Sequence, residues 1–275
     1  MDNKKILKRA GSLKVEGNKS KLHAWQDLEK RIDSAPKYQS YKKLVWATTS
    51  VAAAAIVVFI LFIVRPTTYQ TLAGEKTTIT LPDNSLIYLN AGTTLKVNTW
   101  NWDTNRGISL DGEAFFVVTP GSSFSVESVN GTVKVLGTEF NVYSRQNHYT
   151  VDCYSGKVNV THPRHDQSVD LIANEGVRLN KDDQFTAKYT LNSEHAKSWF
   201  AGQFFYESAP LQLVFDEIER QFGYTVKTET DISSRYYSGH FTDENLITAL
   251  ELVCVPMGIH FSIVKEEDEK VIRIH

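Results

Sequence analysis

The hydrophobic pattern of the chain changes character three times along its length. Its most uniform stretch is residues 44–64, an unbroken run of 21 residues without a charged side chain. With about 1.5 Å of rise per helical residue, such a run crosses the roughly 30 Å hydrocarbon core of a bilayer. It is longer than the apolar region of a signal peptide, and it ends in Arg65-Pro66 instead of a small-residue cleavage site. The pattern predicts a single transmembrane helix over residues 44–64.

A short amphipathic helix is expected before this run. Trp25, Leu28 and Ile32 are spaced i, i+3 and i+7 within a polar, Lys-rich segment, so they share one face of a helix. A helix of about ten residues is marginal alone and needs a partner or a membrane surface to cover such a stripe. Two interpretations stay open: a docking helix for a cytoplasmic protein, with these three residues as the contact, or a juxtamembrane stalk with Trp25 at the headgroups.

After the apolar run, residues 71–179 predict many short strands, because segments rich in β-branched and aromatic residues alternate with turn signals. Turns are expected at 82–85, 111–112, 120–121 and 155–156. Asn130-Gly131 is the dipeptide favoured by a two-residue type I′ hairpin, whose central positions both need positive φ. The expected fold is an all-β sandwich or roll, with strands at Thr77 to Leu81, Leu86 to Leu89, Ala114 to Val118, Thr132 to Val135, Phe140 to Tyr143, Tyr149 to Cys153 and Lys157 to Val160.

From residue 199 the pattern predicts a small α+β domain with two helices. Ser208 is expected to cap the first helix and Gly223 to end it, with Leu211, Val214, Phe215, Ile218 and Phe222 on one apolar face. Thr242 is expected to cap the second, which buries Leu246, Ala249, Leu250 and Val253. Strands are expected at Phe204 to Tyr206, Tyr224 to Lys227, Ser238 to Phe241, Ile259 to Val264 and Val271 to Ile274.

Charge gives the chain an orientation. Residues 1–43 contain 12 Lys and Arg against 5 Asp and Glu, whereas residues 66–275 contain 17 against 27. Positive flanking charge stays cytoplasmic, so the N-terminus is expected inside and the later domains outside. The acidity of the outer part argues against direct nucleic-acid binding, which needs a basic face to replace counterions.

Several segments together resemble one family. Glu75 onward (EKTTITLPDNSLIYLNAGTTL), LDGEAFFVV at 110–118, LGTEFNV at 136–142 and SGKVNV at 155–160 are similar to the motifs of FecR-like transmembrane anti-sigma factors. WFAGQFFYESAPLQLVFDEIERQFG at 199–223 resembles the small C-terminal domain of that family, which is similar to the short domains of secretins and TonB-dependent receptors. Trp25 to Ile32 resembles the final helix of the family's sigma-binding domain.

The resemblance implies an inner-membrane regulator of cell-surface signalling. Its partners would be an extracytoplasmic-function sigma factor inside the cell and the signalling domain of a TonB-dependent outer-membrane transporter in the periplasm. The expected organisation is a cytoplasmic arm (1–43), a transmembrane helix (44–64), a periplasmic FecR-like β domain (65–180), a linker (181–198) and a C-terminal α+β domain (199–275). Within the motifs, Gly112 and Gly137 are expected in turns, and the carboxylates of Glu113 and Glu139 are expected to cap nearby amides.

No motif for catalysis, metal binding or a cofactor occurs, so the protein is not expected to be an enzyme. His162 and His165 flank a turn and are expected to be solvated side chains. Cys153 and Cys254 are expected to be buried free thiols in different domains. The alternative function is a membrane-tethered glycan-binding or structural envelope protein, with Trp100 and Trp102 as the sugar contact.

Overall fold

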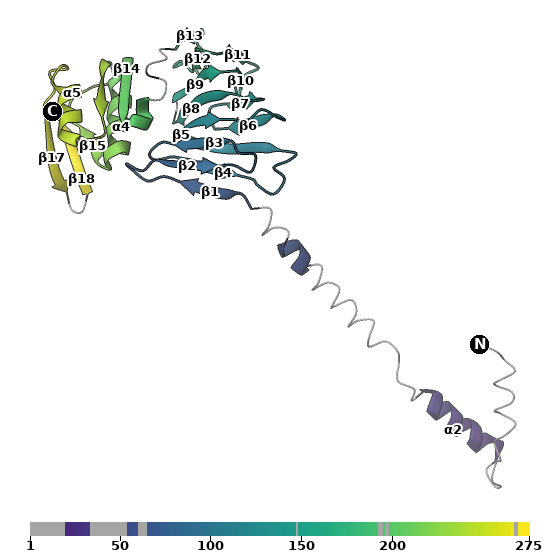
Figure 1. Cartoon of the computed structure of the whole chain (residues 1–275). Helices are drawn as coiled ribbons and strands as arrows, with labels where there is room; N and C mark the ends of the chain where they lie inside the picture. Colours follow the sequence, from purple (N-terminus) through teal and green to yellow (C-terminus); the bar gives the residue numbers. More distant parts are fainter. Residues whose placement is uncertain are drawn as a thin grey trace. The chain divides into compact units, whose positions relative to one another are not determined.

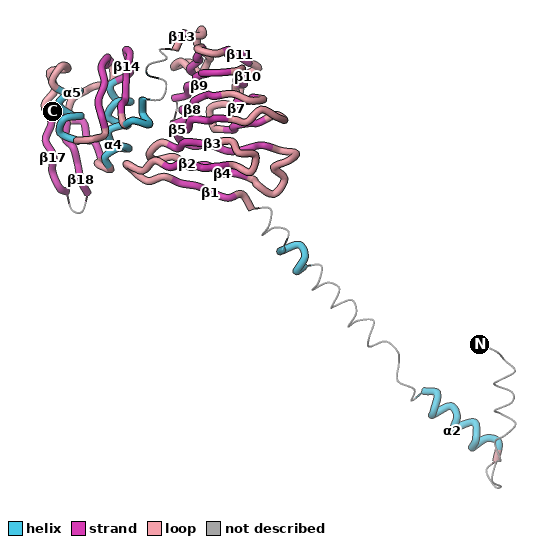
Figure 2. Tube along the Cα trace, viewed as in Figure 1, coloured by secondary structure: helices cyan, strands magenta, loops and turns pink. Residues whose placement is uncertain are grey.

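A computed structural model of the chain describes residues 20–33, 54–59, 65–146, 148–191, 195, 198–266 and 269–275. The chain divides into two compact units, Met1–Phe62 and Ile63–His275. In the first unit, α2 (Lys21–Asp33) is a regular helix (Figures 1 and 2). Its described side chains are exposed. Residues 54–59 of the predicted membrane run are also helical and exposed, and the rest of that run lies outside the described residues. Within the described ranges, no helix combines the length and the apolar character needed to cross a bilayer.

The larger part of the second unit is a β domain, drawn as stacked strands in Figure 2. Each strand places alternate side chains in one apolar core, because successive residues of a strand point to opposite faces. The prediction of an all-β sandwich or roll is confirmed. Its strands are β1 (Thr67–Gln70), β2 (Thr77–Thr80), β3 (Leu86–Leu89), β4 (Thr94–Val97), β5 (Arg106–Val117), β6 (Phe124–Glu127), β7 (Thr132–Val135), β8 (Glu139–Arg145), β9 (His148–Ser155), β10 (Lys157–Thr161), β11 (Ser168–Ile172), β12 (Glu175–Arg178) and β13 (Tyr189–Thr190).

These strands form two sheets that share β5. The first half of β5 pairs with β4 and β6, in a sheet that continues through β7, β10 and β11. Its second half pairs with β3 and β8, in a sheet that continues through β9, β12 and β13. We call the second one the junction sheet, because the outer face of its strands meets the C-terminal domain.

The transition between the sheets occurs at Gly112, and here a predicted turn is wrong. Gly112 adopts φ +132°, so the strand bends without ending. A Cβ at Gly112 would lie 2.5 Å from Thr93 Oγ1, which leaves room for hydrogen only. Glu113 therefore lies within a strand and not after a turn. Its carboxylate accepts hydrogen bonds from the side-chain amides of Asn90 and Asn141, which are distant in the sequence, and not from amides of a local turn.

The hairpin between β6 and β7 also differs from its prediction. Glu127 pairs with Thr132, which leaves a four-residue loop, and neither Asn130 nor Gly131 has positive φ. Asn130 is buried and donates to Ser144 Oγ at 3.1 Å, while a Cβ at Gly131 would lie 2.7 Å from the Tyr149 ring. The two residues serve packing and not a type I′ turn.

The C-terminal domain has the predicted α+β composition. β14 pairs with β16 in one small sheet, and β15, β18 and β17 form a second, in which β15 runs parallel to β18. The apolar faces of α4 and α5 lie in one core with both sheets. The elements are η2 (Ser198–Ala201), β14 (Gln203–Pro210), α4 (Leu211–Phe222), β15 (Thr225–Thr228), β16 (Tyr236–Thr242), α5 (Leu246–Cys254), β17 (Phe261–Glu266) and β18 (Glu269–Ile274).

Both predicted N-caps in this domain are wrong, whereas the C-cap is confirmed. α4 begins after Pro210 without a side-chain cap, because β14 extends through Ser208 to Pro210. α5 is capped by Asn245, whose side chain accepts from Thr248 N–H, three residues beyond the expected Thr242. Gly223 ends α4 in the left-handed conformation, as predicted.

Cys153 and Cys254 are both free and buried, in the β domain and the C-terminal domain respectively, as predicted. Burial raises the pKa of each thiol to about 11, so at neutral pH both are unreactive. The segment 181–198, expected as a linker, contains β13 and places Phe185 against the core of the β domain.

Candidate functional site

Helix α2 carries the residues predicted to contact a cytoplasmic partner. Trp25, Leu28 and Ile32 are 69%, 49% and 64% exposed, so nothing in the described part of the chain covers their stripe. Leu22, three residues before Trp25, is 70% exposed and extends the stripe by one turn. The sequence interpretation missed Leu22, although its i−3 spacing from Trp25 gave the signal. The role of these residues as a partner contact stays a prediction.

A second candidate site lies where the junction sheet meets the C-terminal domain. The contact begins with aromatic rings: Phe200 stacks on Tyr88 at 4.8 Å between centroids and meets Phe115 edge-on at 5.2 Å. Phe115 is fully buried and belongs to the core of the C-terminal domain, although β5 carries it. The two domains therefore share an apolar contact and are not joined by the chain alone.

A buried polar network extends this contact. Gln221 Nε2 of α4 donates to Asn90 Oδ1 at 3.0 Å and to Glu217 Oε1 at 2.7 Å. Arg220 forms an ion pair with Glu217 Oε2 at 2.8 Å and reaches Tyr143 OH of β8 at 3.3 Å. Glu217 is only 3% exposed, so these hydrogen bonds and the ion pair must offset the free-energy cost of burying its carboxylate. The network joins residues more than 120 positions apart, such as Asn90 and Gln221.

The segment that follows β1, residues 71–76, also forms hydrogen bonds and an ion pair with the C-terminal domain. Lys76 Nζ bonds to Asp243 Oδ2 at 2.6 Å and to Trp199 O at 2.8 Å, and it lies 5.3 Å from the centre of the Phe204 ring. Gly74 N–H donates to Arg220 O at 2.8 Å. The C-terminal domain therefore holds the chain a few residues after Arg65, where the predicted membrane run ends.

A cavity of about 360 Å³ lies beside this network, lined by the junction sheet on one side and by residues 198–209 and α4 on the other. The register of the sheet explains its lining. Asn141 pairs with Asp152, Asp152 with Gly176, and Gly176 with Tyr189, so these residues form one row across β8, β9, β12 and β13. A Cβ at Gly176 would lie 2.5 Å from both Asp152 Oδ1 and the Tyr189 ring, and its absence lets Tyr189 OH reach Asp152 Oδ1 at 2.6 Å.

Two carboxyl groups in this cavity have raised pKa values. Burial raises the pKa of Asp152 to about 6, although the Tyr189 hydroxyl and the Arg178 guanidinium oppose the shift. The pKa of Glu113 is raised first by burial and then by repulsion from Glu217, against the hydrogen bonds from Asn90 and Asn141. The folded protein therefore bears a cost for charging both groups.

Replacing Asp152 with asparagine is expected to stabilise the protein above pH 6. The pKa of Asp152 is higher in the folded chain than in the unfolded one. Its contribution to stability is therefore full below about pH 4 and falls as the pH rises to about 6. The asparagine side chain removes that cost and keeps an acceptor for Tyr189, so we expect a gain of about 1–2 kcal/mol at pH 8 and none at pH 4. Urea unfolding at both pH values measures it, with exposed Asp166→Asn as the control; equal effects at both pH values would contradict the assignment.

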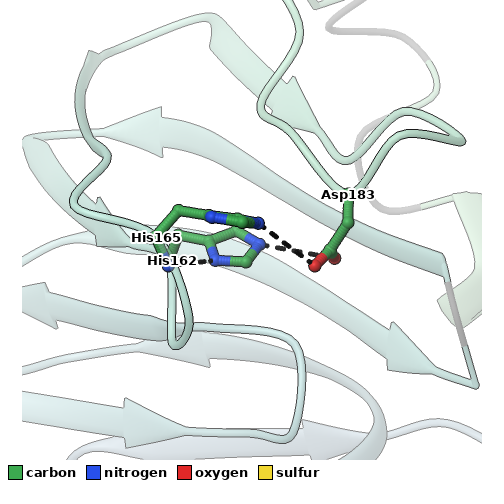
Figure 3. A group of neighbouring side chains, drawn as sticks. All are labelled: His162, His165 and Asp183. Carbon is green, nitrogen blue, oxygen red and sulfur yellow. Dashed lines mark hydrogen bonds and ion pairs between the residues drawn. The ribbon is translucent and has the colours of Figure 1, made fainter.

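A third cluster groups His162, His165 and Asp183, shown in Figure 3 with both rings facing the carboxylate. His162 Nε2 lies 3.4 Å from Asp183 Oδ1, and His165 Nε2 lies 3.7 Å from Asp183 Oδ2. His162 is buried, so the prediction of a solvated side chain without a third partner is wrong for it; His165 is about half exposed. Asp183 lies 21 residues beyond His162 in the chain, so no short sequence motif could have predicted this cluster.

The hydrogen bonds of this cluster favour a structural clamp over a metal site. His162 Nδ1 accepts from the backbone N–H groups of Arg164 and His165, each at 3.1 Å, so the neutral ring carries its proton on Nε2, toward Asp183. A metal ion at Nε2 would have to displace that proton. Arg164 also bonds to both oxygens of Asp183; although desolvation works the other way, this pairing lowers the pKa of Asp183.

The tryptophans proposed as a sugar platform do not form one. Trp100 is 60% exposed, but Trp102 is 5% exposed and packs edge-on against Phe124 in the core. The two side chains therefore cannot present a common face to a sugar, and the glycan-binding alternative loses the contact on which it rested.

Comparison with known families identifies the class of protein. The family described as "FecR protein" matches residues 67–159, and "FecR, C-terminal" matches residues 203–272. The two matches fall in order on the β domain and the C-terminal domain, and together they cover more than half of the chain. The chain therefore belongs to the FecR-like family, as its motifs indicated, and this family is a regulatory one.

Solved structures agree with this assignment. Two crystal structures of a "putative anti-sigma factor" from Parabacteroides distasonis ATCC 8503, at 2.50 and 1.65 Å resolution, are similar to this chain. They share 27% and 26% sequence identity with it, with TM-scores of 0.69 and 0.68. Each comparison covers 76% of this chain and 98% of the other. No curated protein matches the sequence.

Proposed function

We propose that the chain is a single-pass inner-membrane anti-sigma regulator of cell-surface signalling. Residues 1–43 would lie in the cytoplasm, residues 44–64 in the membrane and residues 65–275 in the periplasm. The observation that carries the proposal is the ordered match of both FecR models, together with structural likeness to proteins described as anti-sigma factors. The charge difference about the apolar run supports the orientation.

Inside the cell, the proposed partner is an extracytoplasmic-function sigma factor that binds the stripe of α2. Trp25 is the natural anchor, because a large exposed aromatic side chain contributes most when a partner covers it. Burying the stripe on a partner would also stabilise a helix of this length, which is marginal on its own.

In the periplasm, the proposed partner is the signalling domain of a TonB-dependent outer-membrane transporter. Both small sheets of the C-terminal domain end in strands that pair on one side only within the described residues, such as β16 and β17. Such edges offer backbone groups to an added strand. The contacts of Lys76 and Gly74 would let a change in the C-terminal domain reach the chain beside the membrane.

The cytoplasmic half of the proposal is tested by capturing the host's extracytoplasmic-function sigma factors with the tagged full chain in detergent. We expect one sigma factor to be retained, and Trp25→Ala to weaken its binding about 30-fold, the effect of losing a central aromatic anchor. His23→Ala, two positions away and on the opposite face of the helix, is the matched control and should bind normally. If Trp25→Ala and His23→Ala bind equally well, or if no sigma factor is retained, the assignment of α2 is wrong.

A further inference from the structure

The cavity at the junction contains two buried carboxyl groups and one hydrogen-bond acceptor that nothing in the described chain satisfies. Glu113, Asp152 and Asn141 line it together. Asn141 is 6% exposed. Its Nδ2 donates to Glu113, and its Oδ1 has no hydrogen-bond partner among the described residues. A buried amide oxygen without a donor is costly, so this atom indicates a group that the chain does not itself supply.

The charges around the cavity are also unbalanced. Glu217 is matched by Arg220, so that pair is complete. Neither Glu113 nor Asp152 has a Lys, Arg or His within ion-pair distance among the described residues. Among these residues, the basic side chains of the lining are Arg178, at the rim, and His195, whose ring stacks on Phe205. A cation that entered would meet two carboxylates for which charging is costly and would relieve that cost.

Aromatic rings complete the lining and indicate which cation fits. Tyr143, Tyr154, Tyr189, Trp199, Phe204 and Tyr206 all border the cavity. A guanidinium is planar, stacks on such rings and offers five N–H donors, whereas an ammonium is a compact charge with three. Arg178 already shows this mode of contact, since its guanidinium carbon lies 4.4 Å from the centre of the Tyr189 ring. The volume, about 360 Å³, is in the range of small-ligand sites, which begin at about 300 Å³.

We propose that this cavity binds a guanidinium group, held by Glu113, Asp152 and the Asn141 side-chain oxygen between aromatic rings. The guanidinium belongs either to an arginine side chain presented by a protein partner or to a free guanidino compound. Trp199 on the same lining has a buried Nε1–H that lacks an acceptor among the residues the structure describes. It would then donate to a backbone carbonyl next to a bound arginine side chain. The inference goes beyond sigma binding and is tested without a sigma factor.

The test is calorimetric titration of the full chain in detergent with acetyl-arginine-amide. We expect a dissociation constant of about 1 mM or tighter, the affinity of an efficient ligand of this size. Acetyl-citrulline-amide has the same shape without the charge and should bind at least about tenfold more weakly. Equal binding of the two amides, no binding of the arginine amide at about 20-fold above that concentration, or tighter binding of acetyl-lysine-amide would overturn the proposal.

Two variants give effects of opposite sign. Asp152→Asn should weaken binding about tenfold, because it removes one charge-assisted contact. Arg178→Gln should strengthen binding about threefold or more, because it removes the positive charge that competes at the rim. Arg178 is exposed, so its variant is expected to fold normally, and Asp166→Asn, outside the cavity, should leave binding unchanged. Weaker binding by Arg178→Gln, or unchanged binding by Asp152→Asn, would contradict the assigned contacts.

A parallel titration with butylguanidine, which has the guanidinium and the alkyl chain but no carbonyl and no second charge, distinguishes the two sources. Tighter binding of the arginine amide than of butylguanidine assigns the site to a side chain of a protein partner, with a carbonyl available to Trp199. Tighter binding of butylguanidine assigns it to a free guanidino compound. Either order supports recognition of the guanidinium, and a failure of sigma capture would leave both results intact.

Discussion

Replacing Gly112 with alanine is expected to destabilise the second unit by about 3–5 kcal/mol. Two causes act together. The φ of +132° lies in a region that residues with a Cβ rarely adopt. The new Cβ would also lie 2.5 Å from Thr93 Oγ1 and 2.7 Å from Thr93 Cα, so the backbone itself would have to move.

Thr93 is poorly placed to move. Its oxygen atoms hold both neighbouring segments: Thr93 O accepts from Thr71 N–H at 2.9 Å, and Thr93 Oγ1 accepts from Glu113 N–H at 3.1 Å. A shift of Thr93 would therefore disturb the segment after β1 and the strand that carries Glu113. The bend at Gly112 matters for the junction because it directs β5 from one sheet into the other immediately before Glu113.

Gly258→Ala separates the two causes. Gly258 also has positive φ, at +62°, but apart from its own chain neighbours no atom of the described residues lies within 4 Å of the position its Cβ would occupy. Alanine there should cost only about 1 kcal/mol, from backbone strain alone. Chemical unfolding of the wild type and both variants measures the difference, and similar losses at the two positions would show that the close approach to Thr93 is unimportant.

The sequence predicted what depends on local patterns. The strands at 86–89 and 132–135 have their predicted bounds, and the apolar face of α4 lies in the core because its i, i+3, i+4 spacing leaves no other face to bury. The family assignment rested on motifs spread over both domains, and family comparison confirms it.

The errors arose where tertiary packing decided the role of a residue. Asn130-Gly131 has the composition of a type I′ turn, but Gly131 is needed to make room for the Tyr149 ring and Asn130 to hold Ser144. The junction was not foreseen at all, because its members come from segments that meet only after folding. Asn90, for example, lies 131 residues before Gln221 and carries no local signal of their contact. Likewise, the i, i+2 spacing of Trp100 and Trp102 in the sequence could not show that only Trp100 faces solvent.

Glu217→Ala is expected to cost about 3 kcal/mol, the second large effect, because it leaves charged and polar partners unpaired at the junction. Arg220 depends most on Glu217. Burial alone would lower the pKa of Arg220, but the Glu217 carboxylate outweighs that effect and raises it above the usual value. Without the carboxylate, the guanidinium stays charged and partly buried, and the Gln221 amide loses its 2.7 Å acceptor. Asp216→Ala, at a partly exposed position of the same helix, removes one hydrogen bond to Gln212 and should cost under about 0.5 kcal/mol.

One effect of the same substitution opposes this loss, and it makes the prediction specific. Glu217 contributes to the raised pKa of Glu113, so removing it lowers the cost of charging Glu113. Since that relief exists only where Glu113 is ionised, Glu217→Ala should be more damaging at pH 4 than at pH 8. Hydrogen exchange at the Gly74 amide, which donates to Arg220 O, reports whether the loss lies at the junction. We expect the Gly74 amide to exchange faster in Glu217→Ala while the amides of β8 and β9 exchange at their wild-type rates. Equally faster exchange at all of these amides would show that the substitution destabilises the whole unit and not the junction.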